Sequence, residues 1–404
     1  MTAGTTSEAL TYPVSRLSPF DEPEVYGWLR EQRPVCKVDM GGGGTAWLVT
    51  RHADVRAILT DPRVSSDRRH PNFPKTMPGQ GGFAKFKPLL NGMDQPEHGR
   101  VRRALAAEFT SARADAAEPT VRALVDGAVD ALLAAGSPAD LVSHVSLAVP
   151  SLVICDLLGV PYADNEFFQV RSARLVDRTL DGPSRAAAIG ELRDYLARLI
   201  ETKQHTPSDD LISRQIERQR ADGEVDVEHL ISLAFGFLFG GHETTANLIS
   251  LSVVALLSDP AQLDRLKADP ALWPGAVDEL LRYFTVVDSI ASRVATERIE
   301  LGGAVIEPGD GIVAVGLSAN RDETVFADPH RFDIGRRAER HVAFGFGPHK
   351  CIGQHLAKLE LRVVLETLFR RIPSLSLALP VGELEFKVNH TIYGLHALPV
   401  RWSA

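Results

Sequence analysis

A chain of 404 residues exceeds the roughly 250–300 residues that a single hydrophobic core supports, so we expect one large lobed unit or two domains. Its apolar content of 44% and charged content of 24% are ordinary for a soluble globular protein. A net charge of −8 argues against nucleic acid as the main partner, and three scattered cysteines form no disulfide framework and suit a reducing cytoplasm.

The first ninety residues mix short elements with a loop. The N-terminus has no basic head followed by an apolar run, so we expect no signal peptide. The sequence predicts a helix over 22–32 and a hairpin that turns at the four glycines 41–44 and continues as a strand over 45–50. Residues 71–90 are rich in Pro and Gly with interleaved Phe and Lys, which predicts a loop.

Residues 96–284 carry apolar side chains at helical spacing, and core packing alone explains each amphipathic stripe. The longest run, 226–258, is also the most apolar. His242 and Glu243 interrupt the about 20 apolar residues that a membrane span needs, so we expect a buried helix.

The middle of that run, FGGHETTANL at 239–248, is unusual. Each glycine inside a helix costs about 1 kcal/mol relative to alanine. Gly240 and Gly241 stand next to Glu243 and Thr244, which indicates a widened groove that something occupies. A polar pair satisfied within the helix is the alternative. A zinc-protease helix is excluded because position 246 is Ala rather than His.

Beyond residue 284 the pattern becomes strand-rich. Strands are expected around Gly302-Gly303, after the PGDG turn and in the tail from 373, with one helix after position 351. The sequence therefore predicts a mainly α protein with a smaller β portion built from both ends of the chain.

The loop FGFGPHKCIG, 344–353, places Cys351 among three glycines, a proline and a histidine before a helix. A dinucleotide loop needs a third glycine where Lys350 stands. Zinc, a nucleophilic thiol and a small buried residue are further alternatives, but no recognised spacing completes a zinc site and a buried residue does not explain the glycines. The zinc alternative would use His341, His349, Cys351 and His355.

A haem thiolate explains the loop better. Backbone N–H groups must point at such a sulfur, and glycines let the chain bend tightly enough. A helix beginning at Cys351 would add positive dipole, and Phe344 could shield the sulfur.

The stretch FGFGPHKCIGQHLA is similar to the haem-binding signature of cytochrome P-450, with Phe344, Gly347, Cys351 and Gly353 at the signature positions. The resemblance extends over about residues 10–402 and implies that family's fold: a triangular α-rich prism with a long central helix over the haem, and a β-rich lobe. It implies one domain over 1–404. Its β-rich part lies at about 30–70, 290–325 and 373–404, and its α-rich part at about 94–284 and 351–371.

The resemblance also assigns roles. Cys351 is expected to ligate the haem iron, Thr244 to be the alcohol that holds oxygen, and Glu243 the acid that feeds protons. Glu279 and Arg282 match a structural ExxR pair. Spacing alone is weak, because Glu97/Arg100 and Glu217/Arg220 also match, but position favours this pair, with Arg331 as the expected third member. The expected haem-contacting residues besides Cys351 are His98, Arg102, Gly240, Gly241, Arg293, Phe344, Gly345, His349 and Gly353, with His98, Arg102, Arg293 and His349 as propionate donors.

The family's layout gives regional expectations for substrate contacts: the loop 71–90, the stretch 165–190, the residues near 287–291, and 392–393. The residues expected there are Phe86, Leu90, Val287, Ile290, Ala291 and Ile392.

The implied activity is insertion of one oxygen atom of O2 into a C–H bond of a hydrophobic small molecule such as a secondary metabolite, a steroid-like compound or a xenobiotic. The implied cofactor is haem b, with electrons from NAD(P)H through ferredoxin reductase and ferredoxin. Residues 336–362 carry six basic residues against two acidic ones, which predicts a patch that attracts an acidic ferredoxin. A peroxide-driven peroxygenase and a non-catalytic gas-binding protein are the alternatives. We expect a cytoplasmic monomer with no membrane anchor.

Overall fold

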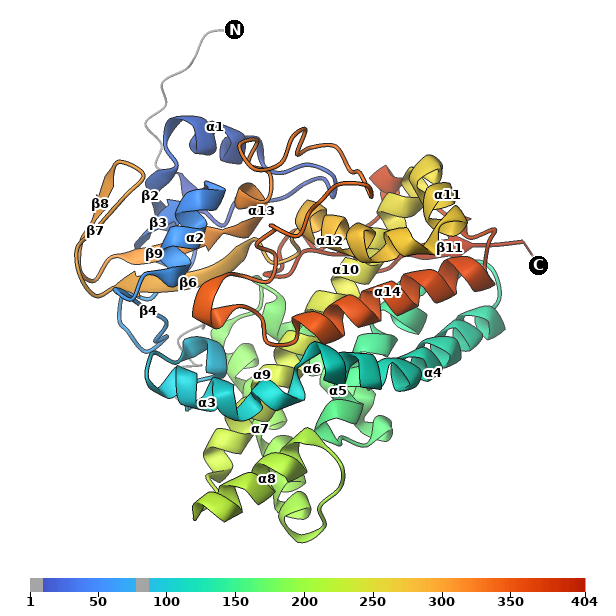
Figure 1. Ribbon diagram of the computed structural model, residues 1–404, viewed down its shortest axis with the longest axis horizontal. Coiled ribbons are helices and arrows are strands. Elements are labelled where there is room, and N and C mark those ends of the chain that lie inside the picture. The colour runs from blue at the N-terminus through green and yellow to red at the C-terminus, as the bar shows by residue number, and fades with distance from the viewer. Residues whose placement is uncertain (1–9, 78–86, 404) are drawn as a thin grey trace, which may run out of the picture.

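The computed structural model describes residues 10–77 and 87–403. Most of the chain is helical, and the strands gather at one side (Figure 1). The predicted fold class, mainly α with a smaller β portion, is confirmed. The helices are α1 Glu24–Gln32, α2 His52–Thr60, α3 Glu97–Leu105, α4 Ser111–Ala135, α5 Ala148–Leu158, α6 Asn165–Val176, α7 Gly182–His205, α8 Leu211–Asp222, α9 Val227–Gly241, α10 Glu243–Ser258, α11 Pro260–Ala268, α12 Trp273–Phe284, α13 Gly316–Ala319 and α14 Gln354–Arg371.

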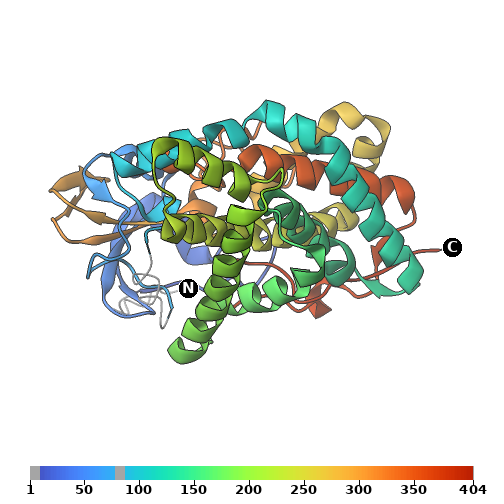
Figure 2. The same cartoon turned by 90° about the horizontal axis from the view of Figure 1, so that it is seen from below.

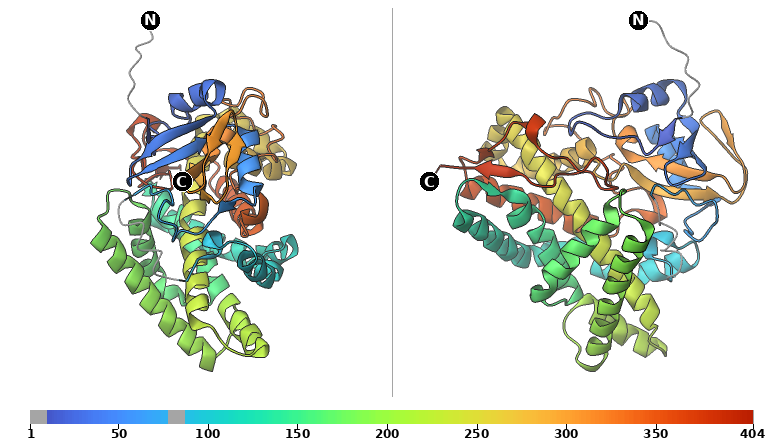
Figure 3. Two further views of the ribbon diagram at one scale, coloured as in Figure 1. Left: turned by 90° about the vertical axis from the view of Figure 1, so that its left-hand side faces the viewer. Right: turned by 180° about the vertical axis from the view of Figure 1, so that it is seen from behind.

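The main sheet joins strands from distant parts of the chain. Its order is β1-β2-β3-β9-β6-β4, and β3 pairs parallel with β9 while β6 pairs antiparallel with β9. The N-terminal and later strands lie side by side in the left view of Figure 3. The bounds are β1 Thr11–Tyr12, β2 Val35–Met40, β3 Thr45–Val49, β4 Val64–Ser65, β6 Ser289–Ala295 and β9 Gly311–Val315.

Two smaller sheets complete the β portion. The hairpin predicted at Gly302-Gly303 forms between β7 Ile299–Leu301 and β8 Ala304–Ile306. The tail is less regular than its sequence predicts, because only short strands form there and pair with a strand from the helical region. These strands are β10 Ser376–Leu377, β11 Pro399–Arg401 and β5 Ala139–Asp140. The main sheet and the C-terminal end lie at opposite ends of the molecule (Figure 2).

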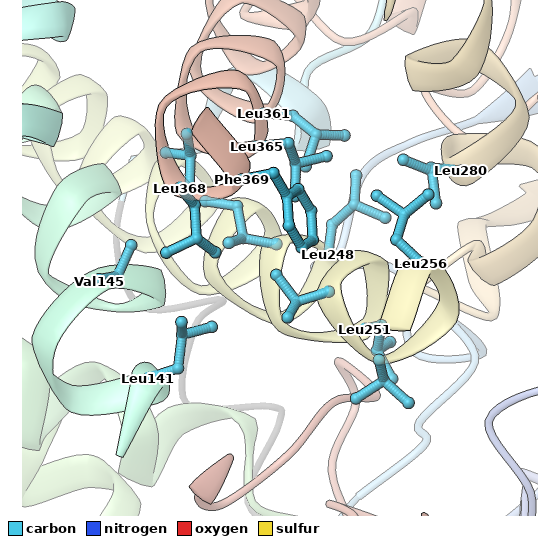
Figure 4. Packing of buried hydrophobic residues seen from close by; sticks show 14 of the residues in the cluster. Leu141, Val145, Leu248, Leu251, Leu256, Leu280, Leu361, Leu365, Leu368 and Phe369 are labelled. Atoms are coloured by element: carbon cyan, nitrogen blue, oxygen red, sulfur yellow. The ribbon is translucent and has the colours of Figure 1, made fainter. Parts of the chain in front are cut away.

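The largest hydrophobic cluster forms where α10 meets α4, α12 and α14. Leu248 and Leu256 lie on the side of α10 that faces Leu365 and Phe369 of α14, whereas Leu251 points to the other side of α10 (Figure 4). Burying a leucine side chain contributes about 1.5–3 kcal/mol, so this cluster fixes α14 against the centre of the molecule. The loop before α14 is thereby held in place.

The predicted long helix over 226–258 is interrupted once, at His242 between α9 and α10. Among the described residues, no single helix has the length and hydropathy of a membrane span. One bent pair, Val227–Ser258 with Pro260–Ala268, passes that test jointly at an angle of 102°, and most of α10 is buried within the protein.

The corner between α6 and α7 is bound to the C-terminal tail. The amide of Arg178 donates to the Asn389 carbonyl at 2.9 Å, and the amide of Thr391 donates to the Val176 carbonyl at 2.8 Å. The same tail contacts α10, since the Lys387 ammonium lies 3.5 Å from Glu243 Oε2.

Candidate haem-thiolate site

The cysteine loop is folded by tight backbone turns. The Cys351 amide donates to the Phe344 carbonyl at 2.8 Å, and Gly345 and Gly347 have φ of 70° and 71°, which favour glycine. A Cβ at Gly347 would lie 2.8 Å from the Leu59 carbonyl oxygen of α2. The glycines are therefore required by loop shape and by close approach to α2.

The Cys351 sulfur faces a backbone amide, as a ligating thiolate requires. The Gly353 N–H hydrogen-bonds the sulfur. The many protein atoms around the sulfur raise the pKa of the thiol, and the Gly353 amide, Arg102 and Lys350 act against this rise. The residue nevertheless keeps part of its surface accessible to solvent. The expectation that a helix begins at Cys351 is wrong, because α14 begins at Gln354. The hydrogen-bond donor to the sulfur is the Gly353 amide, which precedes the helix.

Gly240 opens the helix surface at the α9–α10 joint. It is exposed, and a Cβ placed on it would have no atom within 4 Å. The Thr244 hydroxyl donates to the Gly240 carbonyl at 2.8 Å, which is the side-chain-to-backbone bond expected of a mid-helix threonine. An open surface and a hydroxyl thus lie side by side on one turn.

Gly241 has a different role, and we correct its assignment. A Cβ on Gly241 would lie 2.8 Å from Cδ1 of Ile154 in α5. Its missing side chain makes room for helix packing, whereas only Gly240 leaves open space.

Glu243 points away from the open surface. It is 1% exposed, and its Oε2 atom lies 3.5 Å from the Lys387 ammonium and 3.1 Å from the Asn247 amide. Burial opposes ionisation, but Lys387, His242 and Asn247 outweigh it and hold the pKa below its usual value. Glu243 is therefore an anion whose ion-pair partner comes from the C-terminal tail.

Basic side chains converge beside the cysteine loop. The rings of His98 and His349 lie 3.8 Å apart between centroids, and Arg102 donates to the Lys350 carbonyl at 2.6 Å. Burial first, then Arg293, His98 and Arg102, lower the pKa of His349 to about 3. The four sequence-predicted donors, His98, Arg102, Arg293 and His349, therefore lie within electrostatic reach of one another.

Arg68 joins this cluster, and sequence reasoning missed it. Burial lowers the pKa of Arg68. The pKa of Arg293 is lowered to about 10, first by the burial of Arg293 and then by the nearby charge of Arg68. It stands in an ordinary basic run, DRRH at 67–70, so no local signal distinguished it from its neighbours.

The cluster fits two carboxylates. Its buried nitrogens include three without a hydrogen-bond partner, namely His98 Nε2, His349 Nδ1 and Arg68 Nε. Buried arginines that repel one another, here Arg68 and Arg293, require counter-charges, and the neutral histidines can donate hydrogen bonds beside them. Charge-assisted hydrogen bonds to carboxylates are the strong kind. The two propionates of haem would supply this chemistry.

The ExxR pair, Glu279 and Arg282, is buried, and a second arginine, not the one expected from the sequence, also binds Glu279. Arg282 binds Glu279 through two hydrogen bonds of 2.7 and 2.8 Å, and both side chains are 0% exposed. The third member is Arg336, whose Nε lies 3.1 Å from Glu279 Oε1. The prediction of Arg331 is wrong, because Arg331 is exposed and offers only its backbone carbonyl, at 3.4 Å from Arg282.

The expected substrate contacts lie on separate segments, with Ile290 and Ala291 in β6. Phe86 lies outside the described residues. Ile290 lies at a register shift of β6 and packs close to Gly316, and its contact with substrate stays a prediction. The remaining residues are apolar and buried or half-buried, and their contact with substrate stays a prediction: Leu90, Val287, Ala291 and Ile392.

Comparison with known proteins decides the family. The model of the family described as Cytochrome P450 matches residues 272–374. Cytochrome P450 105A3 of Streptomyces carbophilus is 46% identical over 98% of this chain and 97% of its own. The vitamin D3 dihydroxylase of Streptomyces griseolus is 47% identical and covers 98% of both chains. The chain belongs to the cytochrome P450 family.

Solved structures agree. The crystal structure of the P450 MoxA from Nonomuraea recticatena is 50% identical, covers 98% of this chain and 99% of its own, and has a TM-score of 0.91. Relatives of this P450 are named as hydroxylase and monooxygenase, and it is a P450 monooxygenase. The family binds haem, which explains the cysteine loop and the uncompensated basic cluster together.

Proposed function

We propose that this P450 oxidises a medium-to-large hydrophobic small molecule, such as a secondary metabolite, a steroid-like compound or a xenobiotic, with one oxygen atom of O2. One observation carries the proposal: Gly240 leaves open space beside the Thr244 hydroxyl. The names of relatives, a vitamin D3 dihydroxylase and a pentalenic acid synthase, support the substrate class.

The side chains have distinct parts in this activity. When bound, haem supplies the activation of oxygen and the oxidation of the C–H bond. Cys351, whose sulfur accepts a hydrogen bond from the Gly353 amide, would ligate the haem iron, and the basic cluster would hold the two propionates. Thr244 holds a proton next to the open surface. Glu243, one residue earlier, is the buried carboxylate that would take up a proton and pass it on towards Thr244.

Electrons are proposed to come from NAD(P)H through a ferredoxin reductase and a ferredoxin. The predicted basic patch over 336–362 is smaller than its sequence suggests. Arg336 is paired with Glu279, Lys358 with Asp278, and Arg362 with Glu118 and Glu366. Arg337 and Arg340 are exposed in this segment and could contact an acidic partner. Arg100 and Arg103 are exposed on α3, the helix whose Arg102 binds the Lys350 carbonyl.

Two alternatives use the same haem. A peroxygenase would use hydrogen peroxide directly, and a gas-binding protein would not turn over. The buried Glu243 next to Thr244 favours oxygen activation over both, because proton delivery is useful only when oxygen is cleaved.

The test is turnover with purified holoprotein, NADPH, a ferredoxin and its reductase. A compound library is first screened for shifts in the visible haem spectrum, and the strongest binders are assayed for oxidised product. Product that needs NADPH and the ferredoxin supports the proposal. Product formed only with added peroxide, or no product from any spectral binder, contradicts it. A cytoplasmic location, a monomeric state and a single domain over 1–404 stay predictions.

A further inference from the structure

The side chain of Gln95, just before α3, contacts His98 of the basic cluster. Gln95 Nε2 lies 3.2 Å from His98 Nδ1. The other ring nitrogen of His98, Nε2, is buried and has no hydrogen-bond partner among the described residues. The imidazole therefore has one nitrogen against an amide near the surface and its second nitrogen buried and unmatched.

His98 is held firmly in this position. It is 1% exposed, and its backbone N–H donates to the Asp94 carbonyl at 2.8 Å. Its ring lies against that of His349, with 3.8 Å between the centroids and 31° between the planes. These contacts fix the backbone and the ring plane, so the property that remains to be set is which ring nitrogen carries the proton.

The ring of His98 is neutral at neutral pH. Burial, then Arg102 and Arg293, lower its pKa, and Asp94 acts against them. A neutral imidazole donates from one nitrogen and accepts at the other. The direction in which His98 donates therefore depends on the partner that it meets.

The two ends of the Gln95 amide have different neighbours. A Cβ placed on Gly99 would lie 2.6 Å from Gln95 Oε1 and 3.3 Å from Arg103 Nη1, so the amide oxygen and this guanidinium lie on the same side. The NH2 group consequently faces His98, and an amide NH2 group only donates. His98 Nδ1 must then accept, which leaves the ring proton on Nε2, the buried nitrogen.

His349 has a less selective partner. Its Nε2 lies 3.2 Å from the Ser66 hydroxyl, and a hydroxyl can donate or accept. Ser66 therefore fits either neutral form of the His349 ring, whereas the Gln95 amide in this orientation fits only one neutral form of His98.

We infer that Gln95 is a positioning residue for the cofactor, which keeps the single ring proton of His98 on Nε2, where it can be donated to a haem propionate. The opposite form would turn a lone pair towards a carboxylate, and two acceptors repel. The inference concerns retention of haem and needs neither a substrate nor turnover, so its failure and that of the proposed function are separate results.

The first test locates the proton directly. In a neutron structure of the holoprotein crystallised in D2O, we expect a deuteron on His98 Nε2 and none on Nδ1. A deuteron on Nδ1, alone or together with one on Nε2, would overturn the inference.

The second test is the transfer of haem from the ferric holoprotein to apomyoglobin. We expect Gln95→Leu to lose haem about threefold to tenfold faster than the parent, the effect of one ordinary hydrogen bond. Asn91→Leu makes the same kind of change at an exposed amide four residues earlier and should stay within about twofold of the parent. A parent-like rate in Gln95→Leu would count against the role of Gln95.

Two further variants separate positioning from a merely structural role. His98→Phe keeps an aromatic ring for the contact with His349, and adding Gln95→Leu to it should not change the rate, because Gln95 acts through His98. Gly99→Ala favours the helix, but its Cβ would displace the Gln95 amide, so faster haem loss there could not come from a weakened α3. If Gln95→Leu had the same effect with and without His98, the inference would be wrong.

Gln95→Glu keeps the shape of the side chain and replaces the donor with an acceptor. His98 Nδ1 must then carry a proton, and Nε2 has one only while the ring is a cation. The new carboxylate and Asp94 favour that cation, whereas burial, Arg102 and Arg293 oppose it.

Because the cation is lost as the pH rises, haem loss from Gln95→Glu, divided by that of the parent, should increase about tenfold between about pH 6 and about pH 9. A ratio that does not change with pH would show that the amide does not set the proton of His98.

Discussion

The Thr244 hydroxyl donates a 2.8 Å hydrogen bond to the carbonyl of Gly240, the residue one helical turn earlier. Gly240 is exposed, and a Cβ placed on it would meet no atom within 4 Å. The Thr244 hydroxyl, which carries a movable proton, therefore lies next to open space at the α9–α10 joint. The adjacent Thr245 makes the same kind of bond, to Gly241 at 3.2 Å, but it is buried.

This difference makes the two threonines a matched pair. We expect Thr244→Ala to lower product formed per NADPH by about tenfold or more, because positioned proton donors contribute about 10²–10⁴-fold to rate. Thr245→Ala should leave this ratio within about twofold. Equal coupling in the two variants would remove Thr244 from the proton path.

Arg336 should matter for stability and Arg331 should not. Removing Arg336 leaves the buried Glu279 with one cation fewer, and a hydrogen bond to a charged group contributes about 1.5–3 kcal/mol. We expect Arg336→Ala to lower the free energy of unfolding by about that amount in urea. Arg331→Ala, on the surface, should change it by less than about 0.5 kcal/mol. The reverse order would restore the sequence-based assignment.

Arg68 should hold the cofactor. Its Nε is buried and unpartnered, whereas the neighbouring Arg69 is paired with Asp67 at 2.8 Å and is 57% exposed. We expect haem to dissociate about 10–100 times faster from Arg68→Met than from the parent, which corresponds to the loss of one charge-assisted hydrogen bond. Transfer of haem to apomyoglobin measures this rate, and Arg69→Met is the control. Identical rates in both variants would exclude Arg68 from the cluster.

The pair of Lys203 and Asp210 gives a pH-dependent prediction. The two groups lie 2.5 Å apart and are almost fully buried. Burial opposes ionisation of Asp210, but Lys203, Ser208 and Ser213 hold its pKa below the usual value. A carboxyl whose folded pKa is depressed stabilises the protein above its unfolded pKa of about 3.9 and loses that contribution as the pH falls towards the folded pKa.

We therefore expect Asp210→Asn to lower the unfolding free energy by about 3 kcal/mol at pH 7, since breaking a buried pair is costly, and the deficit to shrink as the pH falls below about 4. Asp209→Asn is the matched control, because Asp209 is 97% exposed although it also pairs with an arginine. Urea unfolding at several pH values measures both. A deficit that does not depend on pH would show that ionisation of Asp210 is not the source.

Much of the site could be predicted from local sequence. Cys351, its glycines and the GGHETT turn carry their chemistry in consecutive residues, and helical spacing places His98 and Arg102 on one face. Arg68, Arg336 and Lys387 could not be found in this way. Each reaches the site through a loop, and loop conformation depends on tertiary contacts that periodicity does not encode.

Helix boundaries show the same limit. The run 226–258 has one helical pattern, yet the helix is interrupted at His242, where the Thr244 and Thr245 hydroxyls bond the carbonyls of Gly240 and Gly241. The expected strands of the tail shorten to β10 and β11, since much of that segment is used to cover Glu243 and the α6–α7 corner.

The central claim is that Cys351 ligates the haem iron. It is tested most directly by reducing the purified holoprotein under carbon monoxide and recording the Soret band. We predict the long-wavelength band of a thiolate-ligated haem, and its loss in Cys351→His. A Soret maximum where histidine-ligated globins absorb, in the parent protein with its full complement of haem, would contradict the claim.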